Sequence, residues 1–243
     1  FLLEGQDRPE SRRYRRNILN RRSGHRRYRL LRRTKTETAP LIMFQSLSYA
    51  EMDYSLSIDG APESIPGGTG LLLVHPSTGE TDRVDTEFLS GDTDHFMVVS
   101  TRTTAREVTQ KIEHYEVDES KAVILDTLSV ERGFTRRRRE DVRYVSSPDD
   151  LENIIEQTRD FLDTHDGKRR LSVDSLTEMI YYADEDQTQE AIEEFCDLLA
   201  EYDAVGLFHL ARGVHDERVL EEFRSAFDGV IELQSDGSMT VSY

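Results

Sequence analysis

The chain has 243 residues, with 31 basic residues against 48 acidic ones, a single cysteine, and no apolar run long enough to cross a bilayer. These counts exclude a disulfide scaffold and a membrane span, and a hydrophobic fraction of 36% over this length suits one domain with an apolar core. We expect a cytoplasmic protein, because the three apolar residues at the start are too few for a secretory signal.

Charge divides the chain near residue 42. Residues 1–42 carry 12 Arg and one Lys against four acids, a net charge of +9, whereas residues 43–243 have a net charge of −26. We interpret 1–42 as a disordered basic tail. It is either a nucleic-acid arm or, the interpretation we favour, a translated upstream stretch with the true start at Met43 or Met52. Residues 43–65 would then lead into a domain at 66–243.

The acidic part indicates a salt-rich cytoplasm, such as that of a halophilic archaeon. The whole chain has only 4 Lys against 27 Arg. At molar salt the Debye length is only about 3 Å, so repulsion among the carboxylates is largely screened. The alternative is an ordinary acidic protein from a low-salt cell.

The first half of the folded part alternates apolar runs with amphipathic stretches. Apolar runs predict strands at 70–75, 95–101 and 122–128. Residues 83–89 suit a short helix, and Ala105, Val108 and Ile112 repeat at helical spacing after the start signal Thr103-Thr104. Residues 130–145 read as a polar loop, in which Arg136 to Arg139 form a solvated run or, less in keeping with the acids beside them, a phosphate-backbone contact.

The second half continues the alternation. A helix starts after Ser147-Pro148, with Leu151, Ile154, Ile155 and Leu162 on one face, and strands are predicted at 170–176 and 204–211. Helical pieces cover 179–182 and 217–227, and 229–233 pairs with 239–242 as a closing hairpin. A further helix between them has a stripe of Ala191, Ile192, Phe195, Leu199 and Tyr202. Continuous apolar strands alternating with helices predict an α/β fold, a mostly parallel sheet with helices on both faces.

The turn after the first strand of this sheet is the place to look for a ligand. It consists of His75, Pro76, Ser77, Thr78, Gly79, Glu80 and Thr81. A phosphate-binding P-loop reads Gly-x-x-x-x-Gly-Lys-[Ser/Thr]. Gly79 and Thr81 fit this pattern, but Val74 replaces the first glycine and Glu80 replaces the lysine. Glu80 should repel phosphate, so we interpret the turn as a vestigial nucleotide site; the plainer interpretation is a tight turn that opens a helix.

Longer stretches carry a resemblance. The segments SLSIDGAPESIPGGTGLLLVHPSTGETD, VRYVSSPDDLENI, LSVDSLTEMIYY and HDERVLEEFRSAFDGVIEL together resemble the RecA/KaiC-like P-loop superfamily, in particular its haloarchaeal branch. The resemblance covers about residues 55–243 and implies a RecA-like sheet. It also implies that the Walker B aspartate falls on Asp174, in the VDSL stretch, although Asp126 follows a more apolar run.

The same resemblance implies that the water-activating acidic pair is missing. Family members with ATPase activity carry that pair just after the second strand, where this chain has Arg102 and Thr103. With Glu80 in place of the lysine, two parts of the phosphoryl-transfer apparatus are absent. We therefore expect a non-catalytic regulatory or interaction module without a cofactor. The alternative is an ATP-binding or slowly hydrolysing relative that uses Thr81 and Asp174 with Mg²⁺.

The remaining candidates favour structural roles. The histidines have no metal-ligand spacing, so no metal site is expected, and His209 lies in an apolar strand as a core or strand-end residue. Cys196, on an amphipathic helix, suits a buried inert thiol. Tyr181 and Tyr182 should pack against the sheet. For partners, we expect another protein or self-association, with no nucleic acid and no membrane.

Overall fold

The computed structural model describes residues 52–77, 81–130, 132–133 and 139–243. All of them belong to one compact unit, Ser48–Tyr243. The predictions for the basic tail, Met43 and Arg136 to Arg138 concern residues outside these ranges. So do three residues of the predicted nucleotide site, Thr78, Gly79 and Glu80.

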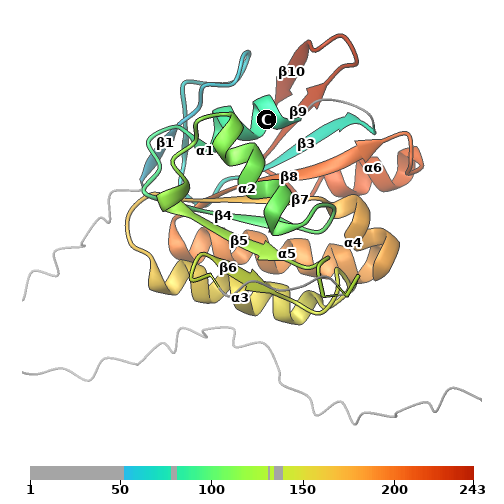
Figure 1. The fold of residues 1–243 in the computed structure, drawn as a ribbon. Helices are drawn as coiled ribbons and strands as arrows, with labels where there is room; N and C mark the ends of the chain where they lie inside the picture. The colour runs from blue at the N-terminus through green and yellow to red at the C-terminus, as the bar shows by residue number, and fades with distance from the viewer. Residues whose placement is uncertain (1–51, 78–80, 131, 134–138) are drawn as a thin grey trace, which may run out of the picture. The chain divides into compact units, whose positions relative to one another are not determined.

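An eight-stranded sheet forms the centre of the unit, with the order β10-β9-β3-β8-β7-β4-β5-β6 (Figure 1). Its strands are β3 (Gly70–Pro76), β4 (His95–Ser100), β5 (Ala122–Asp126), β6 (Val142–Tyr144), β7 (Arg169–Asp174), β8 (Val205–Arg212), β9 (Gly229–Leu233) and β10 (Met239–Ser242). Neighbouring strands pair in parallel except β9 and β10, which form the antiparallel hairpin at the C-terminus. The predicted mostly parallel α/β sheet with a closing hairpin is confirmed.

Helices cover both faces of the sheet because strand side chains alternate between two apolar clusters. On one face, α1 (Asp82–Leu89) and α2 (Ala105–His114) bury side chains such as Phe88 and Ile112 with Leu71 and Leu73 of β3. On the other face are α3 (Leu151–Thr164), α4 (Leu176–Tyr182), α5 (Glu185–Tyr202) and α6 (Glu217–Arg224), which pack with Leu72 and Val74. A short 3₁₀ helix, η1 (Glu119–Lys121), precedes β5.

The structure contains three short strands that the sequence did not predict. β6 lies within the predicted polar loop 130–145, where it pairs with β5 through three residues. β1 (Asp53–Ser55) lies inside the predicted lead-in segment 43–65 and pairs in antiparallel fashion with β2 (Ser64–Pro66), which ends one residue beyond that segment. Tyr54 and Ile65 of this hairpin are fully or almost fully buried in the α1/α2 cluster. Residues 52–65 are therefore packed as part of the folded unit.

The apolar run of the strand predicted at 170–176 is interrupted because basic residues stand at the start of β7. The Arg170 side chain is fully buried, with its guanidinium 5.2 Å from the centroid of the Tyr54 ring and 5.1 Å from that of Phe88. Its Nη2 donates hydrogen bonds to the Ser55 carbonyl and to Asp92 Oδ1, each at 2.8 Å. Arg170 thus stabilises the packing of the β1 segment at the amino end of the sheet.

Candidate functional site

Five adjacent strands carry a buried polar side chain near their carboxyl ends, all on the face covered by α1 and α2. These residues are His75 of β3, His209 of β8, Asp174 of β7, Ser100 of β4 and Asp126 of β5, and none is more than 6% exposed. Ser100 lies in register with Asp174 on one side and with Asp126 on the other. On the opposite face the preceding strand residues, such as Val99 and Val173, are apolar. Polar groups are therefore concentrated at the edge where parallel sheets hold ligands.

Asp174 is paired with a cation from its own chain. Arg102, in the loop after β4, places Nη2 3.0 Å from Asp174 Oδ2. Burial alone would raise the pKa of Asp174, but the positive charges of His209 and Arg102 more than offset it, so this pKa lies below its usual value. Asp174 is consequently a buried carboxylate held ionised by the protein. Its Oδ1 atom has no hydrogen-bond partner among the described residues.

The loop that carries Arg102 is fixed to the residue after Asp174. Thr101 Oγ1 donates to the Ser175 carbonyl at 2.9 Å and accepts from the Ser175 N–H at 2.7 Å, and both residues are buried. Thr101 N–H also donates to the Asp174 carbonyl at 2.8 Å. These bonds join the two loops, so the ion pair between Arg102 and Asp174 belongs to a preorganised structure rather than to a mobile surface contact.

Asp126, the other candidate for the Walker B aspartate, has a structural role. Its carboxylate accepts hydrogen bonds from the backbone N–H groups of Ala105, Leu128 and Ser129 and from the Ser129 hydroxyl, at 2.7 to 2.9 Å. It therefore satisfies donors at the start of α2 and in the turn after β5. That turn ends β5 at Asp126, two residues before the predicted end of the strand.

A second ion pair joins α1 to the middle of the sheet. Asp85 Oδ1 lies 2.9 Å from His209 Nε2 and accepts a hydrogen bond from Ser172 Oγ, also at 2.9 Å. Burial of His209 opposes its positive charge, but Asp85, with a contribution from Asp174, more than offsets burial and raises the pKa of His209. The expectation that His209 is a buried residue of a strand agrees with its full burial; its pairing with Asp85 was not expected.

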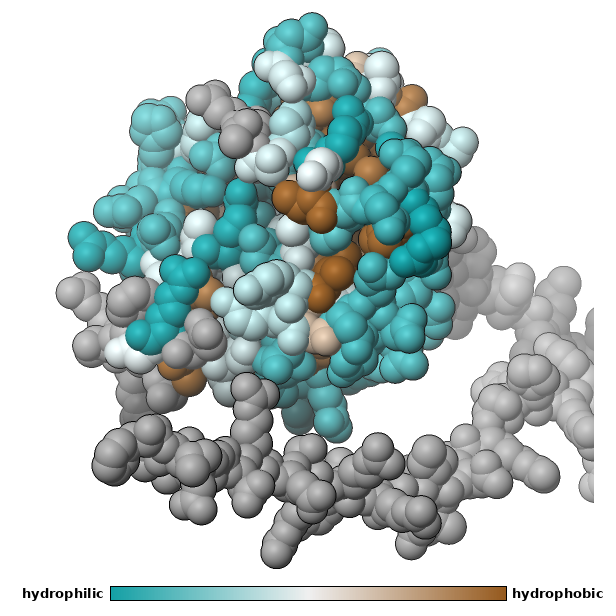
Figure 2. Space-filling model, turned by 90° about the vertical axis from the view of Figure 1, so that its right-hand side faces the viewer, coloured by the Kyte–Doolittle hydropathy of each residue, from teal (hydrophilic) through white to brown (hydrophobic). Residues whose placement is uncertain are grey.

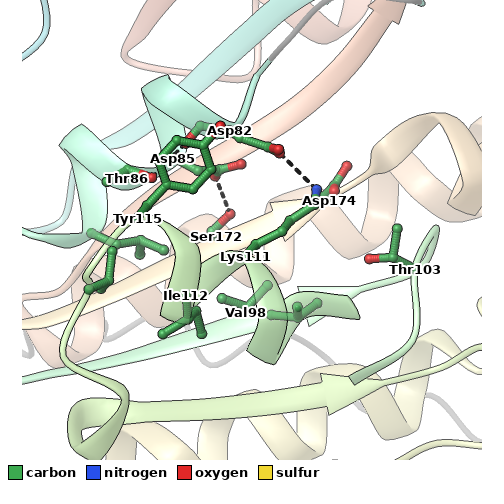
Figure 3. A pocket seen from close by; sticks show the side chains of 13 residues that line it. Asp82, Asp85, Thr86, Val98, Thr103, Lys111, Ile112, Tyr115, Ser172 and Asp174 are labelled. Atoms are coloured by element: carbon green, nitrogen blue, oxygen red, sulfur yellow. Dashed lines mark hydrogen bonds and ion pairs between the residues drawn. The ribbon is translucent and has the colours of Figure 1, made fainter. Parts of the chain in front are cut away.

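A small open cavity lies beside these pairs, between α1 and α2 (Figure 3). It has about 50 Å³ of free volume, and its polar lining includes Asp82, Asp85, Lys111 and Asp174. Lys111 Nζ, from α2, is 2.8 Å from Asp82 Oδ1. Every carboxylate of this lining is thus within ion-pair distance of a cationic side chain of the same chain. The volume suits one or two water molecules rather than a nucleotide.

The described residues of the predicted nucleotide turn show no preformed phosphate cradle. His75 is buried, and its Nδ1–H donates to the Pro76 carbonyl at 2.9 Å. Burial, together with the nearby His209, lowers the pKa of His75, so its ring is held neutral. Ser77 is exposed. Thr81 is buried at the N-cap position of α1, where its side chain makes no capping hydrogen bond.

Magnesium and nucleotide do not fit these residues well. A carboxylate that binds a hard cation needs its oxygens free, and one oxygen of Asp174 is already bonded to Arg102. Near the start of α1 the only described lysine, Lys111, is paired with Asp82. No group of three or more metal-ligating side chains occurs among the residues that the structure describes.

The sequence also predicts burial of Cys196 and packing of Tyr181 against the sheet. Cys196 is only partly buried, not fully as predicted; this burial still raises the pKa of its thiol to about 11 and keeps it protonated. Tyr181, in contrast, does not pack against the sheet: it is 83% exposed on the last turn of α4. The α4 helix turns Met179 inward instead, because residues two positions apart point to different sides of a helix.

A protein-family model matches residues 52–243 of the chain. The chain belongs to the DUF7090 family. That family is described as one of unknown function. A search of curated proteins gave no significant match to this DUF7090 chain. In the described part of the chain, no helix combines the length and apolar character needed to span a bilayer.

Solved structures similar to this DUF7090 chain share its fold. The KaiC-like protein PH0186 from Pyrococcus horikoshii OT3 has a TM-score of 0.52 at 17% identity, covering 77% of this chain and 82% of its own. A prototypical ATPase from the type III secretion system of pathogenic bacteria has a TM-score of 0.51 at 15% identity, covering 76% and 57%. The protein PH0250 from Pyrococcus horikoshii OT3 has a TM-score of 0.51 at 13% identity, covering 72% and 86%. These similarities establish a RecA-like fold.

Proposed function

We propose that this chain is a non-catalytic RecA/KaiC-like module that regulates or binds other proteins, and that its nucleotide site has degenerated. The contact between Arg102 and Asp174 is the observation that carries the proposal. The carboxylate that the family resemblance assigns to Walker B is bonded to a guanidinium. That guanidinium comes from a position where active relatives are expected to carry an acid.

Charge supports this proposal further. Glu80 stands at the sequence position of the phosphate-binding lysine. Two unit charges about 4 Å apart interact by roughly 4 kcal/mol at an effective dielectric constant of 20, so exchanging attraction for repulsion there weakens phosphate binding strongly. At the same edge, Arg102, Lys111 and His209 each have an internal carboxylate partner. None of these three cations is left free to neutralise a triphosphate.

Exposed side chains at the carboxyl edge of the sheet support the proposal of a partner protein. Figure 2 views the molecule from the side to which β3 and β8 point in Figure 1. Hydrophilic residues cover most of that face, with a few hydrophobic residues between them. Tyr181 and Val214, 83% and 56% exposed, follow β7 and β8 in the chain. An exposed tyrosine such as Tyr181 is a typical anchor of a protein interface.

One observation favours a second function, ATP binding with slow hydrolysis that uses Thr81 and Asp174. Asp174 Oδ1 is buried without a hydrogen-bond partner in the described part of the chain, which leaves one carboxylate oxygen open to a ligand. The cation on the other oxygen and the acid at position 80 count against this alternative.

Titration with ATP and Mg²⁺ in molar KCl separates the two functions. We expect the wild-type protein to show no ATP turnover. Glu80→Lys should bind ATP more tightly if the turn retains P-loop geometry, and still without hydrolysis, because no carboxylate at position 102 or 103 orients the attacking water. The measurements are calorimetric affinity and phosphate release.

Two further variants test the two missing features, the lysine at position 80 and the acidic pair at positions 102 and 103. Glu80→Lys combined with Arg102→Glu and Thr103→Glu tests restored hydrolysis, and Arg102→Gln in the Glu80→Lys background separates loss of the guanidinium from gain of an acid. Turnover by the wild-type protein that disappears in Asp174→Ala would overturn the non-catalytic proposal.

A further inference from the structure

We propose that His209 is a proton-dependent tether that holds the amino-terminal half of α1 against the centre of the sheet. The inference goes beyond the proposed function, since it concerns the position of a helix and holds whether or not nucleotide binds. The regulating ligand is the proton. The device consists of the Asp85 carboxylate on α1 and its two partners on the sheet, Ser172 and His209.

Geometry places this tether at a sensitive point of the helix. Asp85 is one helical turn beyond Thr81 and donates its N–H to the Thr81 carbonyl at 3.1 Å. Its Oδ1 atom receives both sheet contacts, from Ser172 of β7 and from His209 of β8, each at 2.9 Å. His209 itself is fixed, because β8 pairs with β3 on one side and with β7 on the other. A change at the imidazole therefore acts on the helix rather than on the strand.

The two halves of α1 differ in how they are held. Burial of Phe88 and Leu89 anchors the second half. The first half is held by the buried Val84 and by polar contacts, which include Asp82 with Lys111 and Asp85 with Ser172 and His209. Loss of charge at His209 therefore weakens one of the polar attachments of the first turn and leaves the apolar anchor of the last turn unchanged.

Charged and titratable groups from four segments of the chain surround the His209 ring. They are Asp85 on α1, Asp174 at the end of β7, Arg102 after β4, and His75 on β3, whose ring centroid is 5.7 Å away. Lys111 of α2 lines the cavity next to Asp85 and is paired with Asp82. Two carboxylates thus face the imidazole against one permanent cation, while His75 is neutral, which favours the protonated ring.

The sign of the pH effect follows from this balance. Because the pKa of folded His209 lies above its ordinary value of 6.5, its stabilising contribution is fully present below about pH 6.5 and is lost as pH rises through the folded pKa. In alkaline solution Asp85 keeps its bond from Ser172 but loses a charged partner in a largely buried place. The first turn of α1 should then open more often.

Two measurements on the full chain in molar KCl test the tether. Titration of the His209 ring by NMR should give a pKa above the ordinary histidine value of 6.5. Hydrogen exchange of the α1 amides, corrected for intrinsic base catalysis, should show protection near Asp85 falling by about tenfold for each unit by which the pKa is raised, as pH passes through it.

Matched variants decide between a tether and a passive core residue. His209→Gln should make α1 protection independent of pH, whereas His114→Gln, on the exposed side of α2, should behave like the wild type. Asp85→Asn, at a partly exposed position, tests the same contact from the helix and should lower the pKa of His209. The proposal is overturned if the pKa of His209 lies below 6.5, or if the pH dependence of α1 protection survives in both Asp85→Asn and His209→Gln.

Discussion

Arg102 and Asp174 form an ion pair within the chain at the carboxyl edge of the sheet. The two residues lie 72 positions apart in the chain and meet because β4 and β7 are neighbours with Ser100 opposite Asp174. The guanidinium is about one-third exposed, while the carboxylate is almost completely buried. Removing the cation therefore leaves a charge in a place where water cannot replace its partner.

We predict that Arg102→Ala lowers the free energy of unfolding by about 1–3 kcal/mol, less than the loss for a fully buried pair because part of Arg102 is exposed. Chemical denaturation at constant pH and salt measures this value. Arg102→Ala combined with Asp174→Asn should recover much of the loss, since no unpaired charge remains. Arg83→Ala, which removes only exposed contacts with Asp59 and Glu87, is the control and should change stability little.

At the level of single residues, only part of the candidate site could be predicted from the sequence. The family resemblance assigns Asp174 to the Walker B position, and it identifies Arg102 only as a position where an acid is missing. The pairing of these two residues joins neighbouring strands, so residue spacing along the chain does not predict it. Asp85 could have been found: it lies between Val84 and Phe88 on the buried stripe of a short helix, where a carboxylate requires a partner. The apolar strand around His209 offered the matching signal.

Among the elements, short strands were the hardest to predict. β6 and β1 have three residues each, too few for alternation to be distinguished from chance, and both depend on partners supplied by the fold. The long apolar strands and amphipathic helices were located closely because burial on both faces leaves continuous apolar runs in the sequence. β7 is intermediate, since its arginines obscure the run that its buried position requires.

The β1 and β2 hairpin leads to a prediction about truncation. A chain that starts at Met52 should melt at the same temperature as the full chain, because the family match and the described packing both begin there. A chain that starts at Pro66 should be strongly destabilised, as it loses Ile65 and Tyr54, whose ring packs on Arg170. Thermal unfolding by circular dichroism measures both. A fall of several degrees for the Met52 start would contradict the first half of this prediction.

For the whole molecule, the excess of acidic residues should determine how stability depends on salt. Residues 43–243 carry a net charge of −26, and many of the ion pairs that the structure describes lie at the surface, where each contributes little. We predict that stability rises with salt, from about 0.1 M to about 3 M KCl, because ions screen the repulsion among carboxylates. Denaturation by heat or urea at several KCl concentrations measures the trend. A melting temperature that does not change with KCl would remove the argument for a salt-rich cytoplasm.

The hydrogen bonds that Thr101 and Ser175 exchange also have a mechanical consequence. Because the two loops bond to each other in both directions, neither can rotate while the other stays in place. Ser175 lies directly before α4, whose far end exposes Tyr181 to solvent. A force on α4 would therefore move both loops together, with Arg102 and Asp174 still in contact. Thr101→Val would remove both side-chain hydrogen bonds while nearly conserving the volume of the side chain, so that the loop of Arg102 would follow α4 less closely.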